Sequence, residues 1–168
     1  MKRALLLATA PVAVAVVIAG CGGGGGSSNS HAAGASSNAR TGAPAPTTGP
    51  AVKIQKLADG TALVDSQGRA LYLFEADKGD MSRCSGACAS AWPPATTTGA
   101  PTAGPGLSAA KLGTTKRSDG TTEVTYNGHP LYRYAGDSRP GEANGQGLNQ
   151  FGAKWYLLAP TGNKIDTD

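Results

Sequence analysis

Histidine and cysteine are scarce in this 168-residue sequence, which contains two histidines and three cysteines. It has no G-x-S-x-G hydrolase motif, no Walker loop, no G-x-G-x-x-G dinucleotide motif and no C-x-x-C-H haem attachment. His129 is the one histidine in the part that is predicted to fold, and no nucleophile motif accompanies it. The sequence therefore predicts a non-enzymatic protein that needs no cofactor.

An excess of charge of one sign is also missing from the predicted domain. The chain has 15 basic and 11 acidic residues, but Lys2, Arg3 and Arg40 precede the domain, and without them it is close to neutral. No basic run is interleaved with aromatic residues, as a nucleic-acid-binding surface would need. We predict no nucleic-acid partner.

No apolar run is long enough to span a bilayer comfortably as a helix, which takes about 20 residues. The apolar stretch at residues 4–18 follows Lys2 and Arg3 and closes on Ile18-Ala19-Gly20-Cys21. This ending resembles the bacterial lipobox, in which the peptide is cut before the cysteine and the cysteine carries the lipid. We predict a signal peptide at 1–20 and acyl chains such as palmitate on Cys21, which would hold the protein on the extracytoplasmic face of the cell membrane.

Residues 21–51 are rich in Gly, Ser and Pro and contain almost no large apolar side chain. Such a segment buries too little surface to offset its ordering entropy, so we predict a disordered tether. All nine aromatic residues lie beyond it, in a domain predicted at 52–168.

That domain contains an internal repeat. Leu71–Asp77 (LYLFEAD) recurs 60 positions later as Leu131–Asp137 (LYRYAGD), and the upstream match runs without a gap. Downstream the register slips by three, so that Trp92 matches Trp155. A fixed period indicates one supersecondary unit built twice. We predict repeats at 52–94 and 107–160, joined by a Thr/Pro/Gly linker at 95–106 without core residues.

Each repeat predicts short strands rather than helices. Apolar residues alternate with a period of two along 61–66 and 122–126, and 69–74, 129–134 and 154–159 are predicted as further strands. Asn127-Gly128 is a strong hairpin signal. Leu71 and Leu73 would face one side of their strand and Tyr72 and Phe74 the other, so that this strand is buried on both faces. The fold class expected is all-β: antiparallel hairpins and meanders from two pseudo-symmetric repeats in one compact domain.

The combination of motifs resembles a known family. L-Y-x-F-x-x-D followed by C-x3-C and W-P-P, then Y-N-G-x-P-L-Y-x-Y-x-x-D and N-G-Q-G-L-N-Q-F-G-x-x-W-Y, is similar to the bacterial secreted-repeat lipoproteins. That family is described by a Y-x-(F/W/Y)-x-x-D motif and has no settled biochemical function. The resemblance implies an envelope location, and some members are loosely associated with alkane use. Its motif residues here are Tyr72, Phe74, Asp77, Trp92, Tyr132, Tyr134, Asp137 and Trp155.

Three kinds of site remain open on these residues. Cys84 and Cys88 predict a structural disulfide in an exported protein, but a redox pair or a copper site completed by His129 is the alternative. Tyr72, Phe74, Tyr132 and Tyr134 could line a binding groove, although their spacing favours core packing. Acidic and amide residues could instead hold calcium or, more simply, cap turns; they are Glu75, Asp77, Asp80, Asp137, Glu142, Asn144 and Asn149.

Taken together, the sequence predicts a membrane-anchored extracytoplasmic lipoprotein that acts as a binding or structural module of the cell envelope. Its partners would be the membrane, through the N-terminal lipid, and an envelope ligand or protein. An envelope redox or copper-handling protein that uses Cys84 and Cys88 is the first alternative. An accessory role in alkane use is the second.

Overall fold

The computed structural model describes residues 48–167, and its secondary structure is mainly short strands. The predicted signal peptide, Cys21 and all but the last residues of the predicted tether lie outside the described residues. In chain order the elements are β1 (Thr48–Leu57), β2 (Gly60–Val64), β3 (Tyr72–Phe74), α1 (Ala87–Ala91), β4 (Ala100–Ala103), the 3-10 helix η1 (Ala109–Lys111), β5 (Leu112–Lys116), β6 (Thr122–Tyr126), β7 (His129–Pro130), β8 (Asn149–Gln150) and β9 (Ala153–Leu157).

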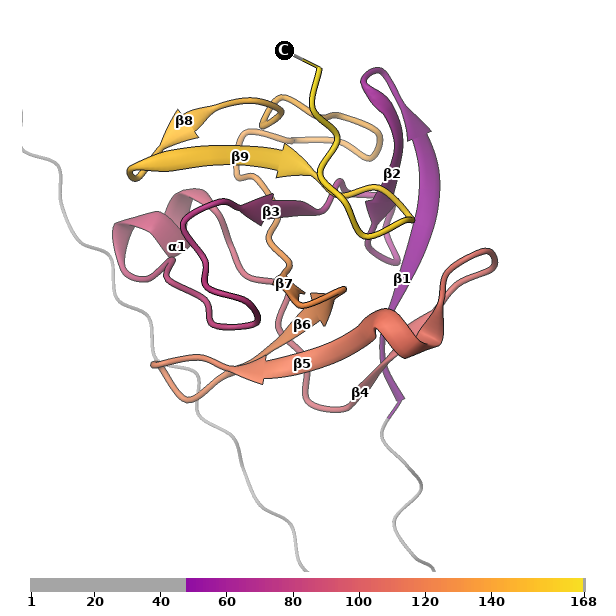
Figure 1. Cartoon of the computed structure of the whole chain (residues 1–168), viewed down its shortest axis with the longest axis horizontal. Helices are drawn as coiled ribbons and strands as arrows, with labels where there is room; N and C mark the ends of the chain where they lie inside the picture. Colours follow the sequence, from indigo (N-terminus) through magenta and orange to yellow (C-terminus); the bar gives the residue numbers. More distant parts are fainter. Residues whose placement is uncertain (1–47, 168) are drawn as a thin grey trace, which may run out of the picture. The chain divides into compact units, whose positions relative to one another are not determined.

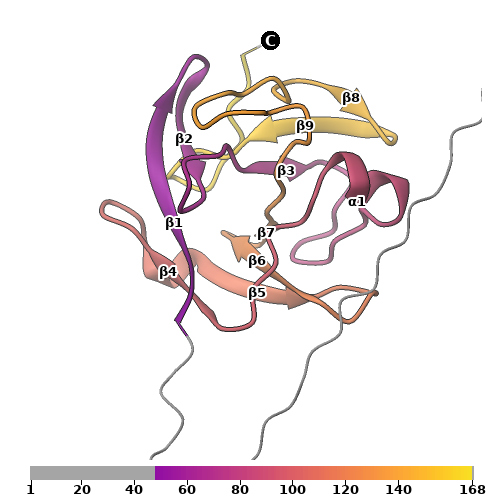
Figure 2. The ribbon, with the colours of Figure 1, turned by 180° about the vertical axis from the view of Figure 1, so that it is seen from behind.

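These strands form three small sheets, with the strand orders β2-β1-β4, β3-β9-β8 and β5-β6-β7 (Figure 1). The all-β prediction is confirmed, but the pairing is not wholly antiparallel, because β1 and β4 run parallel. β1 is long enough to pair with β2 along one part and with β4 along another (Figure 2).

Several predicted boundaries need correction. β1 begins at Thr48, inside the range assigned to the tether, and β4 lies inside the predicted linker. The expectation that the linker has no core residues is wrong, since Ala95 is buried. The predicted strand at 129–134 shrinks to His129–Pro130, and α1 was not foreseen.

The two repeats exchange the segments that carry their tryptophans. β9 of the second repeat pairs with β3 of the first, where Phe74 lies opposite Trp155 (Figure 1). The segment after Trp92 of the first repeat pairs with the second, through Ala95 N–H to Leu131 O (2.8 Å). Because each repeat completes the strand ladder of the other, neither has a full set of backbone partners alone.

The repeats meet at the two motif tyrosines. Tyr72 N–H donates to Tyr132 O at 2.9 Å, and Tyr132 N–H donates to Tyr72 O at 3.0 Å. This reciprocal pair lies where a pseudo-twofold axis relates one repeat to the other. The first hydrophobic cluster contains Tyr72 and Phe74 and the second contains Leu71 and Leu73, which confirms burial of this strand on both faces.

The turns of the two repeats differ in length in a compensating way. Leu57 pairs with Gly60 across a two-residue loop, whereas Arg117 N–H bonds to Thr121 O across three residues. The next turn differs in the opposite direction. In the second repeat Asn127-Gly128 alone connects β6 to β7, and the corresponding loop of the first repeat is longer. Asn127 and Gly128 both have positive φ (52° and 80°), as this turn requires.

The compensating turns shift β6 by one position relative to β2. The ungapped alignment places Glu123 opposite Leu63, but the hydrogen-bond pattern makes Val124 the equivalent of Leu63. Leu63 N–H bonds to Leu158 O of the exchanged strand, and Val124 N–H bonds to Ala95 O in the same way. Glu123 is therefore the equivalent of Ala62.

Candidate functional site

The tyrosine and aspartate of each motif copy bind across the pseudo-twofold axis. Tyr72 Oη donates to Asp137 Oδ2 at 2.7 Å, and Tyr132 Oη donates to Asp77 Oδ2 at 2.9 Å. The second carboxylate oxygen of each aspartate holds its own loop: Asp77 Oδ1 accepts from Arg83 N–H, and Asp137 Oδ1 accepts from the backbone N–H seven residues on. Each aspartate thus holds the loop that follows it, and the crossed bonds explain why a tyrosine accompanies the aspartate in the motif.

The remaining motif residues form a stack of four rings, which we call the four-ring stack, in the order Phe74, Trp155, Trp92, Tyr134. The successive ring centroids are 4.0, 3.9 and 4.4 Å apart. Neighbouring rings come from different repeats, so the stack is built entirely across the pseudo-twofold axis. Tyr72 and Tyr132 meet the two indoles edge-on at 5.3 and 5.2 Å, a favourable geometry for aromatic pairs.

The groove hypothesis for these aromatics is wrong. Tyr72, Tyr132, Trp92 and Trp155 have no exposed surface, and Phe74 is 3% exposed. The alternative prediction, core packing, is confirmed for all of them, while Tyr134 at the end of the stack is half-buried.

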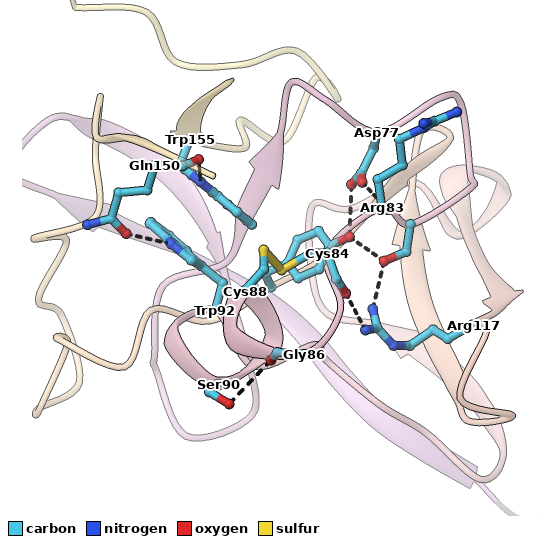
Figure 3. Close-up of a disulfide and its surroundings, with 12 residues drawn as sticks. Asp77, Arg83, Cys84, Gly86, Cys88, Ser90, Trp92, Arg117, Gln150 and Trp155 are labelled. Atoms are coloured by element: carbon cyan, nitrogen blue, oxygen red, sulfur yellow. Dashed lines mark hydrogen bonds between the residues drawn. A yellow bond between two sulfur atoms is a disulfide. The ribbon is translucent and has the colours of Figure 1, made fainter. Parts of the chain in front are cut away.

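A glutamine that sequence reasoning missed holds both indoles. Gln150 Oε1 accepts from Trp92 Nε1–H at 2.9 Å, and Gln150 O accepts from Trp155 Nε1–H at 3.1 Å (Figure 3). Buried indole N–H groups need such partners. The residue stands in N-Q-F-G, a stretch that the family resemblance already included.

The structure contains a disulfide between Cys84 and Cys88, with the Cα atoms 5.2 Å apart. Both cysteines are buried, and Cys88 lies in α1, whose C-cap is Trp92. Arg117 Nη2 donates to Cys84 O at 2.5 Å, which attaches the disulfide loop to the second repeat (Figure 3). This environment is that of a structural bridge.

Removing the bridge should lower stability modestly and change little else. A disulfide that closes so short a loop contributes about 2 kcal/mol through the entropy of the unfolded chain. We expect Cys84→Ser/Cys88→Ser to lose roughly that much in urea unfolding. Alkylation of the native protein should label neither cysteine until a reductant is added. Free thiols in freshly isolated protein would contradict the assignment.

A buried ion pair lies beside the disulfide. Arg117 Nη1 is 2.7 Å from Glu123 Oε2 and also donates to Ser82 Oγ at 2.7 Å, and Ser82 Oγ lies 2.6 Å from Tyr132 Oη. Asp77, Tyr132, Ser82, Arg117 and Glu123 thus form one continuous polar network. Glu123 is fully buried, and its Oε1 has no hydrogen-bond partner among the residues that the structure describes.

Sequence reasoning missed this network, although a comparison of the two repeats contains one signal for it. Arg117 takes the place of Leu57 of the first repeat, and a charged residue at a position that is leucine in the other copy indicates a buried polar site. The first repeat has no counterpart of the ion pair, because Leu57 and Ala62 both lie in a hydrophobic cluster there.

Burial shifts the titration of both acids in the network. Desolvation raises the pKa of Asp77 to about 6, against the hydrogen bonds from Arg83 and Tyr132 that lower it. Desolvation likewise raises the pKa of Glu123 to about 7, against its pairing with Arg117. Both groups therefore take up protons more readily in the folded protein than in the unfolded chain.

The domain should be more stable at pH 5 than at pH 7.5. An acid with a raised folded-state pKa stabilises the fold below its unfolded pKa, and this contribution is lost as the pH rises through the folded pKa. For Asp77 and Glu123 the loss falls between about pH 4 and pH 7, and we expect about 1–3 kcal/mol in all. Denaturant unfolding across this range provides the measurement.

Glu123→Gln is the control, because it removes one titrating group and should flatten the pH profile. His129 acts in the opposite direction, since burial lowers its pKa, but this substitution leaves it untouched. A domain that loses stability from pH 7.5 to pH 5 would contradict the assignment.

The structure does not bring the candidate metal ligands together. Among residues 48–167, no group of three or more His, Cys, Asp or Glu side chains is placed to hold a metal ion. The copper set of Cys84, Cys88 and His129 and the two calcium sets are therefore not assembled. Glu75 instead pairs with Lys164 at 2.9 Å, and Glu142 accepts two backbone N–H bonds from its own loop.

His129 does lie in a cavity, together with Asp77. The cavity has a volume of about 550 Å³ and is lined by Leu73, Phe74, Glu75, Asp77, Gly79, His129, Asn163 and Lys164. Its lining thus comes from β3 and the residues after it in the first repeat, from β7 of the second repeat and from the segment beyond β9.

The fold and the motif geometry define a class: a two-repeat all-β domain in which the repeats exchange strands and the repeated residues build the shared core. The chain belongs to the family of secreted repeats of unknown function, which matches residues 53–96 and 113–159, together more than half of the chain. The resemblance stated from the motifs is thereby confirmed. No match was found among curated proteins or among solved structures.

Membership of this family supports an extracytoplasmic location. Within the described residues, no helix has both the length and the apolar character needed to cross a membrane.

Proposed function

We propose that the chain is a lipid-anchored module of the cell envelope that binds or scaffolds another envelope component rather than catalysing a reaction. The observation that carries this proposal is the use of the motif. Tyr72, Asp77 and their second-copy equivalents satisfy one another across the repeats, and the four-ring stack fills the core. The residues that define the family therefore specify a rigid scaffold, and recognition is left to the surface of that scaffold.

The lipid anchor is tested at Cys21. Acyl chains contribute about 0.8 kcal/mol for each buried methylene, so a multiply acylated cysteine would keep the mature protein on the membrane. We expect Cys21→Ser in a bacterial host with lipoprotein processing to lose the acyl mass and leave the membrane fraction. Mass spectrometry and detergent partitioning provide the measurement, with Cys84→Ser/Cys88→Ser as the matched control. A Cys21→Ser protein that stays in the membrane fraction would overturn the anchor.

One observation supports the redox alternative and one opposes it. The cysteines are bridged, as a redox pair would be in its oxidised form, but Cys84 and Cys88 are 1% and 6% exposed. Thiol–disulfide exchange needs access to a sulfur atom, so the burial favours the structural reading. Rapid reduction of the native protein by a thioredoxin-type reductant would favour the redox alternative instead. The alkane-related role stays a prediction.

A further inference from the structure

The cavity that contains Asp77 and His129 has the features of a ligand site, and we call it the Asp77–His129 cavity. Its volume of about 550 Å³ lies within the range of small-molecule sites. Its walls come from both repeats and from the segment after β9, so its shape depends on their assembly. Leu73 and Phe74 of β3, each held in one of the two hydrophobic clusters, form a rigid part of the wall.

The polar groups of the cavity differ in how much hydrogen-bonding capacity they have left. Lys164 is fully engaged: its Nζ lies 2.9 Å from Glu75 Oε1, 2.8 Å from Asp166 Oδ2 and 4.3 Å from the Tyr156 ring centroid. The His129 side chain is half-buried, and no hydrogen bond joins it to any residue described by the structure.

Asp77 keeps accepting capacity as well. Each of its oxygens accepts one hydrogen bond, from Arg83 N–H and from Tyr132 Oη, whereas a carboxylate offers about four acceptor positions. A neutral imidazole adds one more acceptor. The Asn163 side-chain amide also lines the cavity and offers both donors and an acceptor. The free capacity of the cavity therefore includes several acceptors, one of which, Asp77, carries negative charge.

We propose that the Asp77–His129 cavity binds the primary ammonium group of a small organic molecule, with the Asp77 carboxylate and the His129 imidazole as acceptors. An ammonium has three donors and no acceptor, which complements this set. Its aliphatic chain would lie along the wall that β3 forms at Leu73 and Phe74. The group could come from a free amine or from the ethanolamine headgroup of a lipid. This inference rests on the proposed function as a binding module.

Ligand binding should weaken as the pH falls, because only ionised Asp77 attracts the cation. Arg83 and Arg117 favour the ionised form of Asp77, while burial raises its pKa to about 6. Glu123 disfavours ionisation from within the network, and Glu75 is neutralised locally by Lys164. Burial lowers the pKa of His129, and a protonated His129 would also repel the ligand. From pH 7.5 to pH 5 we expect an affinity loss of roughly tenfold or more.

The test is isothermal titration calorimetry of the full chain in detergent. The probes are n-butylamine, n-butanol as the uncharged match, and glycerophosphoethanolamine as the soluble lipid headgroup. We expect butylamine to bind and butanol not to. Asp77→Asn should weaken butylamine roughly 10- to 100-fold and His129→Ala roughly 2- to 10-fold, the ranges for a charged and a neutral hydrogen bond. Thr98→Ala, which lies at a different cavity, should have no effect.

The outcomes separate the two proposals. Tighter binding of glycerophosphoethanolamine than of butylamine would identify a lipid headgroup as the source of the ammonium, and the reverse would identify a free amine. Equal weak binding of butylamine and butanol, or butylamine binding that neither His129→Ala nor low pH weakens, would overturn the ammonium site. His129→Ala keeps the test decisive if Asp77→Asn fails to fold. Sedimentation of the Cys21→Ser protein, which lacks the anchor, with isolated cell envelopes addresses the binding module itself: if this protein sediments with envelopes but ignores butylamine, only the ligand class is wrong.

Discussion

Replacing Tyr132 by alanine is expected to lower the melting temperature of the entire domain in one cooperative transition, and Tyr72→Ala is expected to do the same. Each ring is fully buried and meets an indole edge-on, and each hydroxyl holds the aspartate of the other repeat. A large aromatic truncated in a core costs roughly 3–5 kcal/mol, against a total stability of about 5–15 kcal/mol for a domain. Calorimetry and denaturant unfolding provide the measurements.

The single transition is the decisive feature of this prediction. Because β9 completes the sheet of the first repeat and the segment after Trp92 completes the second, one repeat cannot unfold while the other keeps its backbone partners. Phe151→Ala is the matched control, since Phe151 is 48% exposed and should leave the transition nearly unchanged. Two transitions, only one of which moves with each tyrosine, would show independently folding repeats and refute the shared core.

The second large effect concerns the buried ion pair. Glu123→Leu should cost roughly 3–5 kcal/mol, because it removes the one buried carboxylate that pairs with the buried Arg117 guanidinium. The other carboxylate near Arg117 is the exposed Asp119, whose Oδ2 lies 3.3 Å from Arg117 Nε. Arg117→Met combined with Glu123→Leu should instead recover most of that loss, since hydrophobic residues of similar volume often replace a buried pair at no net cost. The equivalent positions of the first repeat, Leu57 and Ala62, are already apolar.

A complete double-mutant cycle, with urea unfolding of all four proteins, isolates the coupling between the two side chains. Lys164→Met provides an exposed comparison, because its pairs with Glu75 and Asp166 lie at the surface, where ion pairs contribute little to stability. A double variant that is no more stable than Glu123→Leu alone would show that the bonds of Arg117 to Ser82 and to Cys84 O matter more than the pair itself.

The sequence by itself determined the repeat, the β class and the family. These depend on local features: alternation of apolar residues, Asn-Gly and Asp-Gly turns, and motif residues at fixed spacing in both copies. The burial of both faces around Leu71–Phe74 could be predicted for the same reason. A strand that is apolar at every position has no polar face that could be exposed to solvent. The proximity of Cys84 and Cys88 in an exported chain likewise made the bridge predictable.

Only the tertiary structure decided which repeat supplies the partner of each motif residue. Tyr72 lies five residues from Asp77, but it binds Asp137, and Phe74 stacks on Trp155 rather than on Trp92. Sequence spacing cannot distinguish a bond within a repeat from the same bond across a pseudo-twofold axis, because the partners are chemically identical. The one-residue shift of β6 was equally invisible, since a longer turn before it and a shorter turn after it leave the flanking 60-residue register intact. That shift places Glu123, rather than Thr122, beside Arg117 in the core, and the hydrogen-bond ladder between the exchanged strands is what fixes it.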